Sequence, residues 1–283
     1  MKGQFFGMMA VLALVFGFVG VASVRAEFCG DIPKLHREAQ AGKPQAQMEL
    51  SICYSHGQGV LMDAQQAEGW FRKAAEQGYA PAQFSVGSLY RHGSKEVPKD
   101  ENLADQWLSK AAQGLPALAE QGDVFAQHVL GLMYMTGQGG LPRDGKLAEQ
   151  WLLKAAEQGY PVAQLVLGGY YMRILKHGGL DWIRKAAAQG YVMAQRDLGM
   201  MYEEGRSVPQ DIKEAKAWYR KAAKQGNVNA QQWLERLEKP CRSKCLADVN
   251  TCKAGCMGVD KADRATCNDL CAEAQRACND SCE

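Results

Sequence analysis

The chain has 283 residues, of which 47% are hydrophobic and 23% charged, a composition typical of one large or two modest globular domains. This balance excludes collagen-like and intrinsically disordered chains. The formal net charge is only +2, so the chain lacks the strong positive excess that a nucleic-acid or polybasic membrane partner requires.

The first 26 residues have the pattern of a secretory signal peptide. Lys2 supplies a positive start, an apolar run extends from Phe5 to Val21, and Val24-Arg25-Ala26 is a small-x-Ala cleavage site. Cleavage after Ala26 removes Lys2 and Arg25, leaving 31 basic against 31 acidic residues. No later run of about 18 apolar residues occurs, so we expect a mature protein without a membrane span, located in the periplasm or secreted.

Six copies of the cassette Gly-x-x-x-Ala-Gln reveal an internal repeat. Their glycines are Gly42, Gly78, Gly122, Gly159, Gly190 and Gly226, spaced by 36, 44, 37, 31 and 36 residues. A Trp stands eight residues before four of these glycines, namely Trp70, Trp151, Trp182 and Trp218. A Tyr stands eight residues after the Ala of the first five cassettes, namely Tyr54, Tyr90, Tyr134, Tyr171 and Tyr202.

Each repeat is predicted to be a hairpin of two helices. In the first helix the Ala, an apolar residue four later and the Tyr share one face, and the small residue after that apolar position admits a neighbouring helix. These small residues are Ser51, Gly87, Gly131, Gly168 and Gly199. The second helix is expected to begin after an N-capping Asp (Asp63, Asp100, Asp144 or Asp211) and to end at the Gln-Gly pair. Such a unit cannot bury its own apolar face, so the units must stack.

The repeat resembles the Sel-one-like repeats, relatives of the tetratricopeptide repeat. The pattern Trp-x-x-Lys-Ala-Ala-x-Gln-Gly-x-x-x-Ala-Gln-x-x-Leu-Gly-x-x-Tyr stands nearly whole at residues 151–171 and 182–202. This resemblance implies an all-α solenoid of about five repeats after an N-terminal cap helix, over residues 27–239, acting as a scaffold for protein complexes. Some secreted, cysteine-rich relatives are associated with β-lactamase activity, but the chain contains no Ser-x-x-Lys, Ser-Asp-Asn or Lys-Thr-Gly motif.

Two units depart from the period. An insertion, residues 113–119, lengthens the second unit by two helical turns, and Gly114 and Pro116 within it predict a kink or break. The fourth unit is short, with 11 residues from Tyr171 to Trp182, which predicts a notch in the stack. Each departure is read either as a tolerated surface change or as part of a partner-binding surface.

The last 43 residues hold eight of the ten cysteines and lie in a separate predicted domain, residues 240–283. Pro240 is expected to open a new helix. In both quartets the cysteines have offsets 0, 4, 11 and 15, which place four sulfurs on one stripe of a helix. With Gly258 as a stop and Asp260 or Asp263 as a cap, two antiparallel helices bring the stripes face to face.

Antiparallel geometry selects one nested set of disulfides among the 105 pairings that eight cysteines allow. The expected pairs are Cys241–Cys282, Cys245–Cys278, Cys252–Cys271 and Cys256–Cys267. The alternative is a thiolate site for Cu(I) or Zn, although export favours oxidation and no His accompanies the quartets. The spacing also resembles the Cys-x-x-x-Cys helical hairpins of small disulfide proteins. Cys29 and Cys53 are expected to pin the N-terminal cap, or else to stay unpaired.

The remaining residues do not form a recognisable catalytic or cofactor motif. His56 and His92 occupy the same position in successive units, where they either share a ligand or act as helix-end residues favoured by the helix dipole. The Trp and Tyr rows are interpreted as packing residues. We therefore expect an exported scaffold with no catalysis or cofactor, which binds a protein or peptide on its concave face. The rivals are a thiolate metal binder and, by resemblance alone, a β-lactamase-like protein.

Overall fold

A computed structural model describes residues 28–94, 97–174, 178–256 and 261–282. For part of the tail it describes the backbone alone. The described residues form thirteen helices and no strand. The helices are α1 (Ile32–Gln40), α2 (Pro44–His56), α3 (Ala64–Glu76), α4 (Ala80–His92), α5 (Glu101–Glu120), α6 (Val124–Thr136), α7 (Gly145–Glu157), α8 (Pro161–Ile174), α9 (Gly179–Ala188), α10 (Val192–Glu204), α11 (Ile212–Lys224), α12 (Val228–Cys256) and α13 (Lys261–Cys282).

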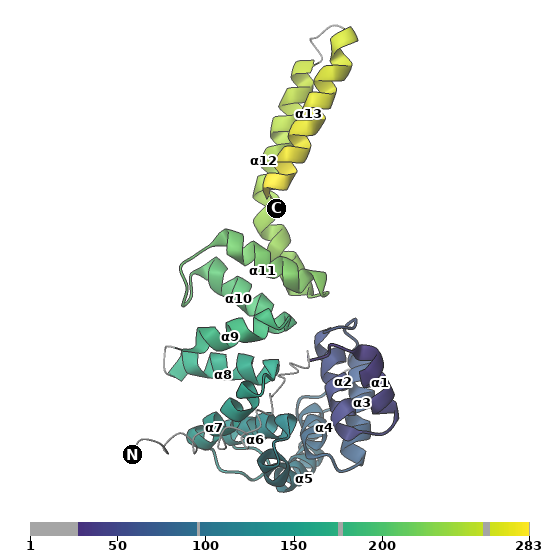
Figure 1. The fold of residues 1–283 in the computed structure, drawn as a ribbon, viewed down its shortest axis with the longest axis vertical. Coiled ribbons are helices and arrows are strands. Elements are labelled where there is room, and N and C mark those ends of the chain that lie inside the picture. Colours follow the sequence, from purple (N-terminus) through teal and green to yellow (C-terminus); the bar gives the residue numbers. More distant parts are fainter. Residues whose placement is uncertain (1–27, 95–96, 175–177, 257–260, 283) are drawn as a thin grey trace, which may run out of the picture.

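The helices form a solenoid followed by a helical rod (Figure 1). Helix α1 covers one end, and the five αα-hairpins α2–α3 to α10–α11 form units one to five. Each helix packs against the next in the chain, and α12 and α13 pack together as an antiparallel pair. The predicted fold class, an all-α solenoid with a disulfide-linked helical hairpin at its end, is confirmed.

The predicted capping residues are present: an Asp begins four of the five second helices, and a glycine ends all five. The four capping carboxylates each accept hydrogen bonds from backbone N–H groups in the first turn, at 2.9–3.1 Å. Every glycine of the Gln-Gly pairs that end these helices has a φ between +84° and +91°, a conformation that glycine adopts without strain. These caps fix where each unit turns, because they satisfy backbone groups that the helix itself leaves unpaired.

The predicted close contact between helices is present at each small glycine. A Cβ atom added to Gly131 would lie 2.7 Å from Leu152 Cγ, and one added to Gly199 would lie 2.5 Å from Tyr219 Cδ1. Gly87 and Gly168 face Leu108 and Ile183 in the same way. The missing side chain is therefore what allows the two helices of a unit to bury large residues between them.

A ladder of glutamines, unpredicted from the sequence, joins the two helices of a unit and ties that unit to the helix before it. In units one, three, four and five, the Gln of the Gln-Gly pair donates a hydrogen bond of 2.7–2.8 Å to the Gln of the Ala-Gln pair in the first helix of the same unit. The bonded pairs are Gln77–Gln47, Gln158–Gln127, Gln189–Gln164 and Gln225–Gln195. Each acceptor glutamine also donates to a carbonyl near the end of the preceding helix. The buried amides are thus paired twice, as buried polar groups require.

The insertion lengthens α5 without breaking it. Of the kink or break predicted at Gly114 and Pro116, the break is wrong, because α5 is a single helix of 20 residues that contains Pro116. Leu108, Leu115 and Ala119 remain on its buried face, since two whole turns preserve the helical phase. Among the described contacts no glutamine pair joins the two helices of unit two, because the two added turns move the end of α5 by about 10 Å.

Two further predictions concern the fourth unit and the tail. Helix α9 has 10 residues where α3, α7 and α11 have 13, so the fourth unit is shortened, but residues 175–177 of the predicted notch lie outside the described residues. Pro240 does not open a new helix, because α12 extends unbroken for 29 residues across the expected domain boundary. The solenoid and the rod therefore share one helix.

The tail cysteines are bonded where the structure describes them. Cys252 and Cys271 form a disulfide that joins α12 to α13, and Cys267 and Cys278 are also disulfide-bonded. The side chains of Cys241, Cys245, Cys256 and Cys282, and residues Gly258 and Asp260, lie outside the described part of the chain. The other three nested pairs stay predictions. Among the described helices, none is long and apolar enough to span a membrane.

Candidate binding site on the inner face

The solenoid curls until its first unit touches its last units. The ring of His56, at the end of α2, lies 5.4 Å from that of Tyr191, which precedes α10. A Cβ atom on Gly57 would lie 3.5 Å from the carbonyl oxygen of Gln225. Figure 1 shows the first helices turned back beside the later units. The inner face is therefore the surface along which unit one faces units three to five.

An aromatic cluster lies at the centre of this inner face. The ring of Tyr160 lies 5.2 Å from that of His128, 5.4 Å from that of Phe125 and 5.2 Å from that of Phe28. Met48 and Ile52 of the first unit belong to the same apolar cluster. Edge-to-face contacts of this kind favour a fixed ring orientation. The cluster thus joins units that are not neighbours in the stack.

Phe28 and Cys29, which precede α1, lie within this aromatic cluster. The Phe28 carbonyl accepts a hydrogen bond from Gln58 Nε2, and the Cys29 amide donates one to Glu49 Oε1, both at 3.3 Å. A disulfide between Cys29 and Cys53 ties this segment to α2. We call Glu49, Gln58, Phe125, His128 and Tyr160 the inner seat: four of them contact Phe28 or Cys29, and His128 packs against the Tyr160 ring. The concave surface that the sequence analysis assigned to a partner is therefore partly covered by the chain's own residues.

Burial controls the charges of the inner seat. It lowers the pKa of His128 to about 4, so the imidazole is neutral at pH 7, and raises the pKa of the Tyr160 hydroxyl well above its ordinary value. Burial also raises the pKa of Glu49, although the hydrogen bond from Cys29 opposes that shift. The seat offers rings and hydrogen-bonding groups in an apolar setting, a combination suited to binding a peptide.

The two histidines at equivalent positions, His56 and His92, each contact a carbonyl of their own helix. His56 Nδ1 contacts the Ile52 carbonyl at 3.0 Å, and His92 Nδ1 contacts the Ser88 carbonyl at 2.9 Å. Each ring thus bonds to the last turn of its own helix. Within the described ranges no group of three or more His, Cys, Asp or Glu side chains is arranged to hold a metal ion.

Five of the six tryptophans form a row on the second helices, each with a lysine ammonium 3.7–4.7 Å from its ring centre. The pairs are Trp70–Lys73, Trp107–Lys110, Trp151–Lys154, Trp182–Lys185 and Trp218–Lys221. Trp70 is buried and the other four are half-buried, so the packing interpretation holds only in part. Trp107 was missed because it lies fifteen residues before Gly122; subtracting the seven inserted residues restores the spacing of eight.

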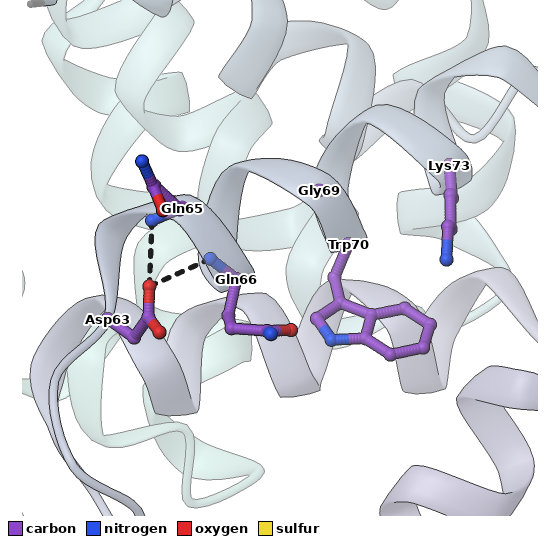
Figure 2. A pocket seen from close by; sticks show the side chains of 6 residues that line it. All are labelled: Asp63, Gln65, Gln66, Gly69, Trp70 and Lys73. Carbon is purple, nitrogen blue, oxygen red and sulfur yellow. Dashed lines mark hydrogen bonds between the residues drawn. The ribbon is translucent and has the colours of Figure 1, made fainter.

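A shallow pocket beside Trp70 is a weaker candidate. Figure 2 shows that its lining residues all come from α3 and the residue that caps it. Asp63 already accepts hydrogen bonds from the backbone of Gln65 and Gln66, and the Lys73 ammonium lies over the indole ring. The polar groups of the pocket are thus engaged in capping the helix and covering the indole ring.

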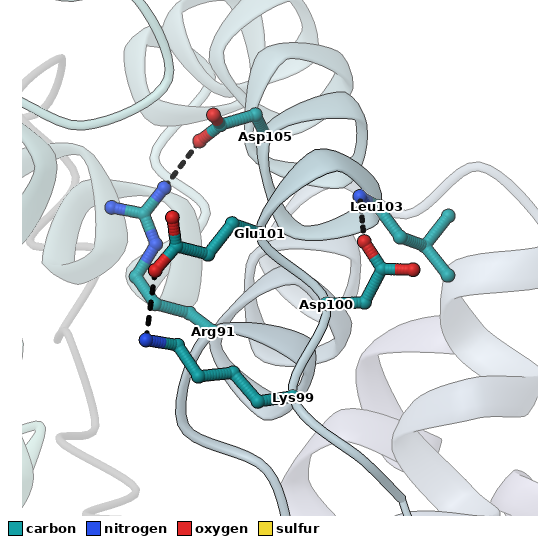
Figure 3. Close-up of polar contacts among 6 residues, drawn as sticks. All are labelled: Arg91, Lys99, Asp100, Glu101, Leu103 and Asp105. Carbon is teal, nitrogen blue, oxygen red and sulfur yellow. Dashed lines mark hydrogen bonds and ion pairs between the residues drawn. The ribbon is translucent and has the colours of Figure 1, made fainter.

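A charged cluster marks the corner between α4 and α5, where the long helix begins (Figure 3). Arg91 pairs with Asp105, and Lys99 pairs with Glu101 at 2.7 Å. Asp105, Lys99 and Glu101 are mostly exposed, so solvent and salt screen these pairs and they contribute little to stability. These pairs support the corner and do not form a binding site.

Comparison with known proteins identifies the type of repeat. The sequence pattern of the Sel1 repeat matches residues 44–79, 80–114, 124–160, 176–191 and 192–227. A solved Sel1 repeat protein from Oxalobacter formigenes is 35% identical, with 73% of this chain and 69% of that one covered and a TM-score of 0.40. A solved protective antigen present in uropathogenic Escherichia coli strains is 33% identical over 74% of this chain and 52% of its own, also with a TM-score of 0.40.

A curated relative matches over a shorter stretch. Chitin synthase regulatory factor 3 of Schizosaccharomyces pombe is 36% identical over 78 residues, which are 27% of this chain and 8% of that protein. The chain therefore spans about half of the bacterial antigen and less than a tenth of the yeast factor.

Proposed function

Because the chain belongs to the Sel1 repeat family, whose members generally act as scaffolds for protein–protein interaction, we propose that it is an exported scaffold that binds a protein partner in the cell envelope. Binding is its whole activity, without intrinsic catalysis. The observation that carries this proposal is the inner face, where a curled stack of repeats gathers aromatic rings and buried hydrogen-bonding groups. A rigid, curved surface of this kind loses little conformational entropy when a partner binds.

Two features support export. Residues 1–26 have the charge, apolar run and cleavage site of a signal peptide. Disulfides Cys29–Cys53 and Cys252–Cys271 also suit an oxidising compartment, since thiols of the cytosol are kept reduced. The rod formed by α12 and α13 then serves as a terminal cap or a second contact surface.

Fractionation and cross-linking test the proposal. The full chain, expressed with its own first 26 residues, should appear in the envelope or medium and should cross-link there to a defined protein. A variant that lacks residues 257–283 shows whether the rod contributes to that contact. Retention in the cytosol, or no cross-linked protein in any fraction, would contradict the proposal.

Two assays address the rival functions. Titration of free thiols in protein from its native compartment should find none in the tail, whereas eight free thiols would support a metal-binding tail. Hydrolysis of nitrocefin by the purified chain would support the β-lactamase-like alternative and contradict a purely binding role.

A further inference from the structure

Phe28 and Cys29 occupy the inner seat in the manner of a bound peptide. The Phe28 ring contacts Tyr160 edge-on at 5.2 Å and lies 6.4 Å from Phe125. The peptide bond that follows is held on both sides, since Gln58 donates to its carbonyl and Glu49 accepts from its N–H. The seat thus contacts one aromatic side chain and the peptide bond that follows it. Neither contact with that peptide bond depends on the side chain of the residue after the aromatic one.

A buried hydrogen-bond acceptor in the same seat lacks a partner. Gln58 is only 6% exposed, and its Oε1 atom accepts no hydrogen bond from the described residues. Leaving a buried polar group unpaired costs about 1–3 kcal/mol, so native chains rarely do so without a reason. A longer extended peptide would supply this oxygen with an N–H donor, which the chain's own segment does not provide.

The segment in the seat is held under local strain. Cys29 has a φ of +62°, a left-handed conformation that is uncommon for residues other than glycine and costs of the order of 1 kcal/mol. Its carbonyl also approaches the turn of unit one so closely that a Cβ atom on Gly59 would lie 2.8 Å from it. The disulfide to Cys53 keeps the segment in place despite this strain.

From these contacts we propose that the inner seat is the partner-binding site, that it takes an extended segment of a protein partner bearing an aromatic side chain, and that Phe28 is an internal occupant which this segment displaces. This inference rests on the proposed scaffold function and specifies the chemistry of the partner. The tether raises the local concentration of Phe28 to the millimolar range, so a free segment competes at a disadvantage. Removing the occupant therefore exposes the site.

A peptide-binding experiment tests this inference. The probe is a fluorescein-labelled peptide, Glu-Phe-Ser-Gly-Asp-Ile-Pro, which copies residues 27–33 with Ser in place of Cys29. Full-length Phe28→Ala/Cys29→Ser/Cys53→Ser, which lacks the ring and has an untethered segment, should bind the probe, and the wild type should bind it at least about tenfold more weakly because its seat is occupied. A probe with Ala in place of Phe should not bind. Adding Gln58→Ala to this triple variant should weaken binding by about five- to tenfold, the loss of one hydrogen bond.

Controls separate the site from general loosening of the fold. Phe84→Ala removes a similar half-buried ring that packs against a different cluster, and it should not gain affinity for the probe. Circular dichroism shows whether each variant is folded. If the triple variant does not fold, the double variant Cys29→Ser/Cys53→Ser keeps Phe28 but frees it, and the probe should bind this variant more tightly than the wild type.

The inference is overturned if a folded variant with an empty or untethered seat fails to bind the probe, or binds the Phe and Ala probes equally. In that case a cross-linked envelope partner would still support the scaffold function. Loss of the partner together with retained peptide binding would instead support the seat and contradict the proposed function.

Discussion

Replacing Gly168 by alanine should destabilise the solenoid, whereas the same change at the next residue, Gly169, should stabilise it. A Cβ atom on Gly168 would lie 2.6 Å from Ile183 Cγ1 and 2.8 Å from the backbone oxygen of Gly179, while one on Gly169 would have nothing within 4 Å. Both residues lie in α8, so both variants gain the same helix propensity, about 1 kcal/mol.

The difference between the two variants isolates the steric contact. Because Gly179 contributes a backbone atom, α8 and α9 must separate to admit the new methyl group, and overpacking of this kind costs about 1–3 kcal/mol. We expect Gly169→Ala to raise the free energy of unfolding by up to about 1 kcal/mol. We expect Gly168→Ala to fall about 1–3 kcal/mol below Gly169→Ala.

Urea denaturation of the oxidised protein, followed by circular dichroism in the far ultraviolet, measures the two values. Equal slopes of the transitions are needed for the comparison, because repeat arrays do not always unfold in one step. Equal midpoints for the two variants would refute the reasoning, since the close contact at Gly168 would then carry no energetic cost.

Three further predictions concern buried groups. Burial lowers the pKa of His128 to about 4 in the folded chain. The unprotonated imidazole therefore contributes stability above pH 6.5 that is lost as the pH falls toward 4, by about 3 kcal/mol in all. His128→Phe should flatten this part of a plot of unfolding free energy against pH. Gln164→Leu removes the hydrogen bonds to the Gln189 side chain and to the Ala156 carbonyl and should cost about 1–3 kcal/mol in urea denaturation, whereas Gln83→Leu, at the position without a rung, should cost less. Cys29→Ser/Cys53→Ser opens a loop of 24 residues and should lower the free energy of unfolding by about 3 kcal/mol; an unchanged melting temperature would show that the bond does not constrain the unfolded chain.

Much of the repeat chemistry was predictable because it is local. The capping role of Asp63 and Asp211, and the close contact at Gly131, follow from spacing within a single unit. The glutamine ladder was not predicted, although its residues are part of the cassette. The Gln side chain could pair with solvent, with its own helix or with the other helix of its unit, and only the packed helices show which partner it has.

Two prolines show where local preference is insufficient. Proline inside a helix costs about 3 kcal/mol, which favoured a break at Pro116 and a helix start at Pro240. Both residues instead lie inside continuous helices. In α5 the burial of Leu115 and Ala119 on the unbroken face opposes that cost, and burial depends on residues far away in the chain.

The sequence alone determined that each unit is a pair of helices, where those helices end, and that the units stack. These features depend on the hydrophobic period, on capping residues and on small residues at fixed offsets. The sequence alone did not determine the curl that presses unit one against units three to five. Curvature accumulates from a small rotation at each contact between units, and no motif records that rotation. For the same reason, nothing in the residues around Phe28 indicated that the chain would fill its own inner seat.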